Sequence, residues 1–412
     1  MALTERPFAV AALVFLVLLP IYLATASYSV LQSNDPRSAA QAGYRVAMTG
    51  DLAFDERWPV DEASWAVEGR DGRYYSNRFP GVISAASLAY ATVRILGGLD
   101  TEAAAHPYDV PLWPATVLAA IVAAFAVALT YLLLDRLHLP HRHVVIATGL
   151  VALGSPVWSV SADALWTHGF THLLLVGMLL ALVDDQRWIA AAAAVVVVTF
   201  RPHLIVAVAI LALASGWKRG RWHLLAGGAV GLALVAGYSL WVFGRPLPAA
   251  GYDVDALVSA APITSVRAFG VNLSYAFVDP YRGLLLYVPA AVFALVPIRR
   301  GWTEAPRWAK AAALAGASYG FTQLALIRAS GGVFFFGHRT LIEALVLASP
   351  LLLTSLSRAC QESVLVRRVV AGVLVVSFAV HTYGAFVGMP QFARAELERR
   401  YEQVSETRDT SP

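Results

Sequence analysis

The sequence predicts an all-α, polytopic membrane protein with roughly 10–12 transmembrane helices and a large first outer loop. Of its 412 residues, 58% are hydrophobic and only 14% are charged, whereas a soluble domain carries about 25% charge. Uncharged apolar stretches of roughly 17–23 residues recur, which is long enough to cross a hydrocarbon core. These stretches are continuous in Leu, Val and Ala instead of alternating with polar residues, so helices are favoured over a barrel.

The apolar stretches give the expected order of spans. We predict full spans at residues 7–27, 112–134, 144–160, 169–184, 222–243, 283–298, 308–327, 340–356 and 369–388. The first is predicted to be a retained span and not a cleaved signal peptide, although Ala24-Thr25-Ala26 resembles a cleavage site. Residues 188–215 are interrupted by Arg201-Pro202-His203, and because proline breaks a helix we expect two half-length helices there.

Basic loops predict the orientation. Lys and Arg gather at 136–142, 218–221, 299–310 and 358–368, which places these loops in the cytoplasm. Loops 28–81, 161–168, 244–282 and 328–339 and the tip at 201–203 are then outside. Segment 82–97 is short, and the acidic, Lys- and Arg-free stretch 98–111 suits the outside, so we expect 82–97 to be re-entrant or otherwise irregular. The chain is predicted to be one domain, residues 1–389, in the plasma membrane with its active face outward, followed by a polar tail at 390–412.

Several function classes find no support in the sequence. The net charge of +4 is not gathered into a basic stripe interleaved with aromatic residues, so no nucleic-acid partner is expected. The chain lacks a Walker loop, a dinucleotide fingerprint and a nucleophile elbow. Metal-ligand spacing is also unconvincing, so no cofactor is assigned with certainty. Cys360 is the single cysteine and cannot form an intrachain disulfide.

The loop 28–81 carries the first candidate site. Asp35 follows the first span closely, and a carboxylate at the membrane edge is a natural general base for a hydroxyl group. The alternative is that Asp35 only caps a turn before Pro36. Residues 39–48 resemble a short helix capped by Ser38. Other polar or aromatic candidates of this loop are Arg37, Tyr74, Tyr75 and Arg78.

Further candidates lie in the later outer segments. Asp163, Trp166 and His168 are close together between two spans, although Asp163 is also suited to capping a helix. Arg201, Arg282 and Arg339 each lie at the outer side of an apolar stretch, and His338 precedes the last of them. One such arginine commonly snorkels to the interface. Three on one face, opposite outer acids, indicate an anion site, because a guanidinium pairs well with phosphate oxygens.

At these residues the sequence resembles the GT-C superfamily of membrane glycosyltransferases, which includes protein O-mannosyltransferases and lipid A aminoarabinose transferases. Members have an acid near the start of a large first outer loop, matched by Asp35, and many bacterial relatives have a "YYSDKPPG" stretch, matched by Tyr74 to Gly81. "TRP", "P.RGL" and "fGpRyl" segments are matched, in the same order, by residues 199–202, 280–284 and 336–341. The chain departs from the pattern at Asn77-Arg78-Phe79 and at His338.

The resemblance implies a polyprenyl-phosphate-linked sugar donor and transfer to an envelope glycan, lipid or protein acceptor on the outer face. Asp35 would be the general base. Asp163 would be a second catalytic acid that orients the acceptor or, if a divalent metal takes part, helps to ligate it. The donor phosphate would be bound by Arg201, Arg282 and Arg339. The acceptor and sugar would contact Arg37, Tyr74, Tyr75, Arg78, Trp166, His168 and His338.

Two other functions fit the same residues. A transporter or flippase of a lipid-linked or anionic solute would use the same arginines, and inverted repeats, which would favour it, are not evident. An inactive relative that acts as an assembly subunit would tolerate loss of the acid in the "DKPPG" motif.

Overall fold

The described residues fold mainly into helices, as the sequence predicts. The computed structural model describes residues 6–28, 33–54, 58, 66–99, 102–214, 220–246, 261–327, 329 and 335–388. The tail at 390–412 lies outside the described residues. Within them, the longer helices are α1 (Pro7–Thr25), α2 (Asn34–Thr49), α3 (Pro80–Ile95), α4 (Trp113–Asp135), α5 (His141–Leu153), α6 (Thr167–Val183), α7 (Arg187–Phe200), α8 (Ile205–Ala214), α9 (Gly220–Phe243), α11 (Val266–Val278), α15 (Arg307–Leu326), α16 (Ile342–Glu362) and α17 (Val364–Tyr383).

Shorter elements connect these helices. The only strands among the described residues are β1 (Ala66–Glu68) and β2 (Tyr74–Ser76), which pair antiparallel. The remaining short helices are η2 (Pro107–Asp109), η3 (Val157–Ser161), η4 (Pro202–Leu204), η5 (Pro262–Thr264), α12 (Leu284–Tyr287), α13 (Pro289–Ala294), α14 (Ile298–Glu304) and η6 (Gly384–Gly388).

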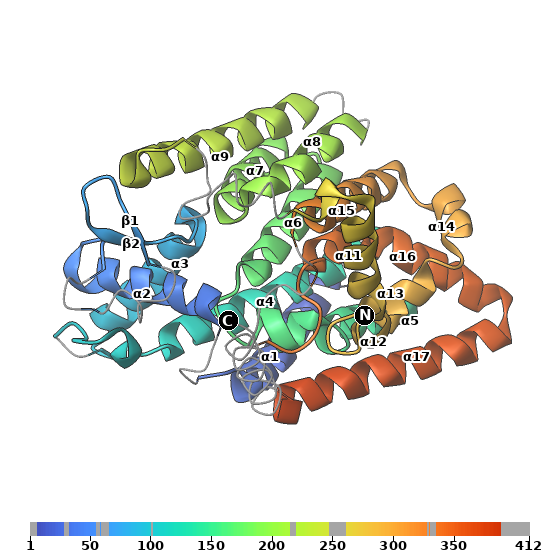
Figure 1. Cartoon of the computed structure of the whole chain (residues 1–412). Helices are drawn as coiled ribbons and strands as arrows, with labels where there is room; N and C mark the ends of the chain where they lie inside the picture. Colours follow the sequence, from blue (N-terminus) through green and yellow to red (C-terminus); the bar gives the residue numbers. More distant parts are fainter. Residues whose placement is uncertain are drawn as a thin grey trace, which may run out of the picture.

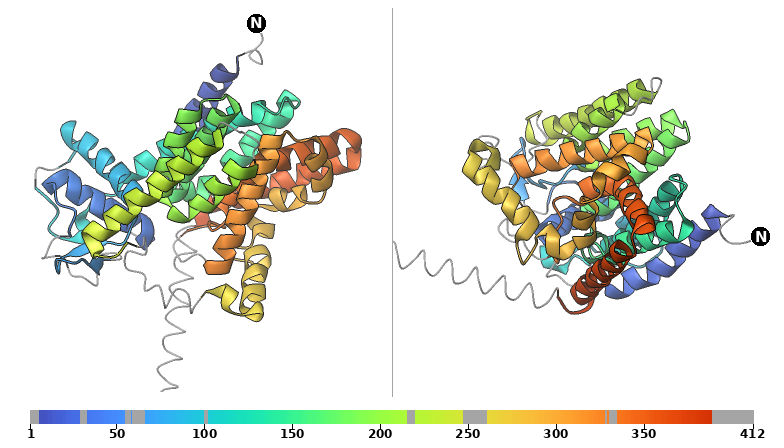
Figure 2. Two further views of the ribbon diagram at one scale, coloured as in Figure 1. Left: turned by 90° about the horizontal axis from the view of Figure 1, so that it is seen from above. Right: turned by 90° about the vertical axis from the view of Figure 1, so that its right-hand side faces the viewer.

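Helices α4, α6 and α16 form the centre of the molecule. The α6 helix packs against α4, α7 and α16, and the α7–α8–α9 group lies along one side of it (Figures 1 and 2). The largest hydrophobic cluster is built from α6, α7, α8, α15 and α16 and is rich in Ala, Val and Leu. The α2–α3 pair and the β-hairpin form one end of the molecule, and α14 and part of α17 lie at the other (Figure 1).

Five helices of the described chain are long and apolar enough to cross a membrane. They are α1, α4, α9, α16 and the helical segment Val364–Phe386. Shorter apolar helices lie at His141–Leu153, Thr167–Val183, Arg187–Phe200 and Pro202–Ala214. The predicted break at residues 201–203 is confirmed, because α7 ends at Phe200 and the chain resumes as a 3₁₀ turn beginning at Pro202.

Three sequence-based expectations about helix bounds are wrong. The predicted span 283–298 is divided, since Pro289 disfavours a helical conformation at Val288 and separates α12 from α13. The predicted span 144–160 ends as an α-helix at Leu153 and continues after a break as the π-turn η3. Ser38 is no cap, because α2 begins four residues earlier at Asn34 and tolerates Pro36 in its first turn.

The α2–α3 contact depends on a residue without a side chain. A Cβ at Gly43 would lie 2.3 Å from the Cβ of Ala86 and 2.7 Å from the backbone nitrogen of Ser87. Because one of these atoms belongs to the backbone, the clash cannot be relieved by a rotamer change. Gly43 therefore sets how closely α2, which carries Asp35, approaches α3.

We expect Gly43→Ala to destabilise the protein by about 1–3 kcal/mol, the usual cost of overpacking a closely packed contact. The apparent melting temperature of the detergent-solubilised protein measures this. Gly237→Ala is the matched control, because a Cβ there meets nothing within 4 Å and alanine is the better helix former. Equal melting temperatures for the two variants would show that the α2–α3 contact does not need glycine.

Candidate functional site

Asp35 lies in the first turn of α2, and both oxygens of its carboxylate are paired with arginine. Arg78 Nη1 donates to Oδ1 and Arg339 Nη1 donates to Oδ2, each at 2.8 Å. Burial alone would raise the pKa of Asp35, but the charges of Arg78 and Arg339 outweigh it and lower this pKa to about 2. The resting carboxylate is therefore ionised at neutral pH.

Local contacts bring Asp35 and Arg78 together. Ser38, one turn after Asp35 on α2, shares a 2.6 Å hydrogen bond with Ser76 at the end of β2. Two residues later, Arg78 Nε donates to the side chain of Asn77 at 2.7 Å. The segment between α1 and α3 thus delivers both the acid and one of its arginines from positions 43 residues apart.

Aromatic rings support the arginines on the opposite side of the site. The guanidinium carbon of Arg339 lies 4.3 Å from the ring centre of Trp166 and 4.9 Å from that of Phe335. Arg282 lies over the same Phe335 ring at 4.5 Å. Such cation–π contacts hold a guanidinium in place without neutralising it. Arg282 and Arg339 therefore share the Phe335 ring as an apolar support.

The backbone before Arg339 is unusual and orients His338. Gly337 has a φ of +100°, a conformation that L side chains rarely adopt. His338 follows, and its Nδ1–H donates to the carbonyl oxygen of Arg282 at 2.8 Å. This bond leaves His338 Nε2 as an acceptor, and that buried atom has no partner among the described residues. The turn therefore connects the two arginine-bearing segments and leaves one hydrogen-bond acceptor open.

A second polar cluster surrounds Glu343, which sequence reasoning missed. Its fully buried carboxylate accepts hydrogen bonds at 2.8 Å from Arg201 Nη1 and Thr171 Oγ1, and His168 Nδ1 lies 2.8 Å from the same oxygen. Tyr319 approaches the other oxygen at 3.4 Å. The signal that could have found Glu343 is its charge within the apolar segment 340–356, since an ionisable group there marks a site by default.

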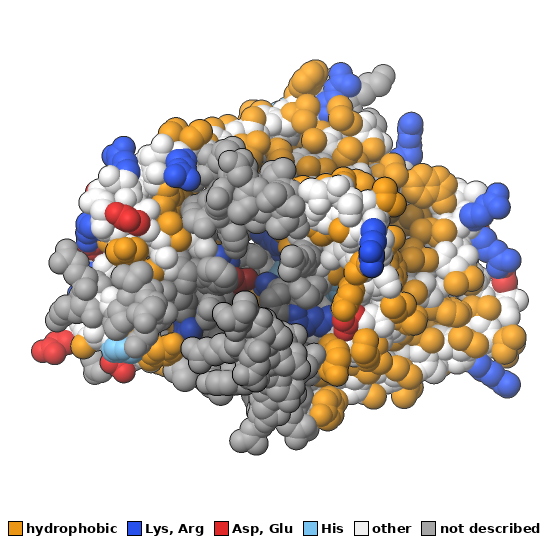
Figure 3. All heavy atoms as spheres, in the orientation of Figure 1, with side chains coloured by type: hydrophobic (Ala, Val, Ile, Leu, Met, Phe, Trp, Pro, Cys, Tyr) orange, Lys and Arg blue, Asp and Glu red, His pale blue; other side chains and the backbone are white. Residues whose placement is uncertain are grey.

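The two clusters are electrostatically connected. The positive charge of Arg201 repels that of Arg339, and a positive charge on His168 attracts the Asp35 carboxylate. The structure thus brings together most of the predicted site residues, namely Asp35, Arg78, Trp166, His168, Arg201, Arg282, His338 and Arg339. A recess near the middle of one face shows acidic, basic and histidine side chains at its floor (Figure 3). The side chains of Asp35 and Arg339 keep 24% and 16% of their surface exposed.

Three predicted residues are engaged in other contacts. The guanidinium of Arg37 lies over the Tyr108 ring at 4.9 Å. Tyr75 donates its hydroxyl to Asp71, and its ring packs against Phe243. Tyr74 lies beside it on β2. None of these contacts involves the Asp35 carboxylate.

Asp163 is buried and makes no ion pair with a described residue. The backbone N–H of Ser27 donates to its carbonyl oxygen at 3.0 Å, at the start of the first loop. Burial raises the pKa of the Asp163 carboxyl group to about 7, although a hydrogen bond from Ser27 opposes this. The two predicted catalytic acids therefore have opposite electrostatic environments.

The excess of arginine over carboxylate side chains in the two clusters favours an anion over a cation. No group of three His, Cys, Asp or Glu side chains converges as metal ligands in the described part of the chain. Arg282 and Arg339 instead face the site with their charge supported by aromatic rings. No protein-family model matches the chain, and no curated protein matches its sequence. The resemblance to GT-C enzymes stays a prediction, and any assignment of function depends on the geometry of the site.

We expect Glu343→Gln to destabilise the fold strongly, because it leaves the Arg201 charge buried without a counter-ion. Breaking one side of a buried pair costs about 3–5 kcal/mol, whereas removing both charges costs much less. Thermal unfolding of Glu343→Gln, Arg201→Gln and the double variant measures the coupling. If the double variant loses as much stability as the sum of the two single variants, the pair is not coupled.

We expect the stability of the protein to depend on Asp163 between about pH 4 and pH 7. Its folded pKa of about 7 exceeds the ordinary value of 3.8, so the native state retains a proton that the unfolded state releases. Stability therefore falls as the pH rises through this window. Asp163→Asn should remove this component and melt at a higher temperature than wild type at pH 8. The control is Asp184→Asn, whose partner is the half-exposed Arg136; identical profiles for Asp163→Asn and wild type would contradict the expectation.

Proposed function

We propose that this chain is an integral membrane glycosyltransferase, which transfers a sugar from a polyprenyl-phosphate-linked donor to an envelope glycan, lipid or protein acceptor on the outer face of the plasma membrane. The observation that carries the proposal is the pairing of Asp35 with Arg339 across 304 residues, beside a second arginine, Arg282, on the same Phe335 ring. The five long apolar helices support a multi-pass location.

In the proposed reaction the acceptor hydroxyl oxygen attacks the anomeric carbon of the donor sugar. The bond between that carbon and the phosphate oxygen breaks, and its electron pair remains on the lipid phosphate. The hydroxyl proton goes to Asp35. Arg282 and Arg339 stabilise the charge that develops on the leaving phosphate, which is the largest electrostatic demand of the step.

Phosphate binding would also activate the base. With a pKa of about 2, the resting Asp35 carboxylate is a poor proton acceptor. A phosphate that draws Arg339 away from Asp35 removes one of the two charges that lower this pKa. The base would then become effective only when the donor is bound.

The fully paired state of Asp35 also supports an alternative, an assembly subunit in which Asp35 forms a structural ion pair. The two functions differ in what they need from the carboxylate. A structural pair tolerates a neutral, hydrogen-bonding substitute better than a catalytic base does. A transporter or flippase has no requirement for proton transfer at Asp35 either.

We expect a polyprenyl phosphate or its glycoside to co-purify with the detergent-extracted wild-type protein and to be lost from an Arg282→Ala, Arg339→Ala double variant. Lipid mass spectrometry makes the comparison and identifies the sugar for a transfer assay. Arg201 is left unchanged because its loss would leave Glu343 unpaired. Arg136→Ala is the matched control, since it removes a guanidinium from a half-exposed ion pair remote in the chain from both arginines.

Asp35→Asn completes this experiment. For the enzyme, the variant should retain the lipid while transfer falls by about 10²–10⁴-fold, the usual contribution of a general base. Lipid retention with unchanged envelope phenotype would favour the assembly subunit or transporter. Bulk phospholipid alone in wild type and variants would remove the support for a lipid-phosphate donor.

A further inference from the structure

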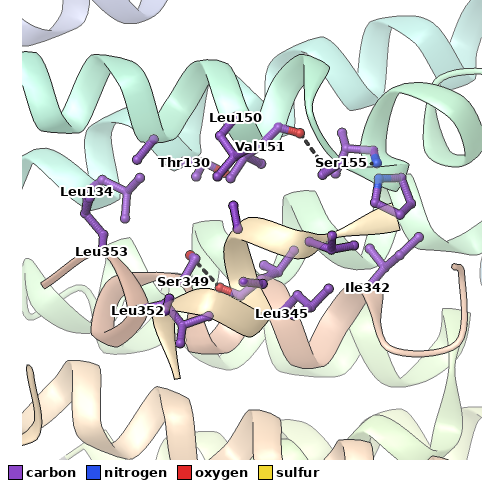
Figure 4. Close-up of a pocket in the computed structure, with 18 of the residues that line it drawn as sticks. Thr130, Leu134, Leu150, Val151, Ser155, Ile342, Leu345, Ser349, Leu352 and Leu353 are labelled. Carbon is purple, nitrogen blue, oxygen red and sulfur yellow. Dashed lines mark hydrogen bonds between the residues drawn. The ribbon is translucent and has the colours of Figure 1, made fainter. Parts of the chain in front are cut away.

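A separate apolar cavity of about 100 Å³ lies between helices α4, α5, α6, α13 and α16. Side chains of α5, such as Leu150 and Val151, face those of α16, such as Leu345 and Ser349, across the space (Figure 4). The lining residues of α16 run from Ile342 to Leu356, a length of about 21 Å at 1.5 Å per residue. The cavity is therefore narrow and long.

Nearly every polar group in the lining is already satisfied. The hydroxyls of Thr130, Ser155 and Ser349 donate to backbone carbonyls three or four residues earlier in the chain at 2.6–2.8 Å. No Asp, Glu, Lys or Arg belongs to the described lining. A phosphate or carboxylate would find no cation there, so a charged ligand is excluded by its desolvation cost.

The exception is His172 on α6. Its Nε2 lies 2.9 Å from Thr130 Oγ1. The only hydroxyl proton of Thr130 is donated to the Ala126 carbonyl, so Thr130 accepts a hydrogen bond from His172 Nε2–H. The neutral ring then presents Nδ1 as an acceptor. This atom is completely buried and has no partner among the described residues, which is costly unless a ligand supplies a donor.

We propose that this cavity binds a lipid alcohol, an uncharged aliphatic chain whose single hydroxyl group donates a hydrogen bond to His172 Nδ1. The long apolar walls suit the chain, and one open acceptor suits one hydroxyl. A trapped water is a poorer fit, because buried waters typically make about three hydrogen bonds and the lining offers one. The site does not depend on the proposed glycosyltransferase activity, since none of its lining residues belongs to the Asp35 cluster.

His172 also fixes the direction of the bound molecule. It lies four residues, about one helical turn, after His168, and Ile342 directly precedes Glu343. The hydroxyl end therefore lies toward the Glu343 cluster, and the chain extends along α16 toward Leu353 and Leu356. Leu150, Leu345 and Leu356 are only partly buried, so the walls are not closed on every side.

The test is photolabelling of the full-length protein in lipid nanodiscs with two matched probes. One is a dodecanol bearing a mid-chain diazirine and the other is the same chain ending in a methyl group. Peptide mass spectrometry locates the adducts. We expect labels on lining residues of α5, α13 or α16, with the alcohol labelling about fivefold more strongly than the alkane, as one net hydrogen bond predicts. Excess unlabelled dodecanol should compete, and dodecane should not.

Variants separate the hydroxyl site from the apolar walls. His172→Phe should abolish the preference for the alcohol, and Ser349→Phe should block both probes by filling the cavity. Leu234→Phe adds the same ring to an exposed position on α9 and is the control. His172→Leu provides a second test if His172→Phe does not fold. The proposal is overturned if the two probes label wild type equally, or if the labels are spread over exposed helix faces. Equal labelling is also the result expected if a trapped water occupies the site at His172.

Discussion

The Glu343 carboxylate joins three separate parts of the chain at the centre of the molecule. It accepts hydrogen bonds from Arg201, at the break between α7 and α8, and from Thr171 on α6, while His168 contacts the same oxygen. A charge this deeply buried is tolerated only with a counter-ion and several hydrogen bonds. The position of the α7–α8 break, the rotation of α6 and the first turn of α16 are therefore fixed relative to one another, and the Asp35 cluster is built upon that arrangement.

This arrangement divides the arginines into two groups with different roles. Arg201 is paired with the fully buried Glu343, so it contributes to the shape of the site more than to anion binding, whereas Asp35, the partner of Arg339, keeps 24% of its side chain exposed. Arg282 and Arg339 are supported by Phe335, and Arg339 also by Trp166. A cation–π contact holds a guanidinium in place without itself neutralising the charge. The proposed phosphate site thus consists of two arginines and not the three expected from the sequence.

Sequence patterns predicted those features that depend on local chemistry. The all-α class follows from continuous apolar runs, and the α7–α8 break follows from Pro202. Pro289, which divides residues 283–298, is equally visible in the sequence, but the apolar composition of this segment predicts one unbroken span. The β1–β2 hairpin was missed because strands of three residues carry almost no alternation. Glu343 was overlooked inside an apolar run, and its pairing with Arg201 across 142 residues has no local signal.

The two predicted catalytic acids illustrate what burial does with and without partners. Asp35 has two arginines, which lower its pKa to about 2, whereas Asp163 has no ion-pair partner in the described chain and its pKa is raised to about 7. Pairs of acids driven apart in this way commonly serve different roles in one reaction. In the proposed enzyme, Asp35 becomes an effective proton acceptor only after the donor phosphate draws Arg339 away from it. Substrate binding would then complete the catalytic group, so that an acceptor hydroxyl is activated only beside a sugar that is ready to be transferred.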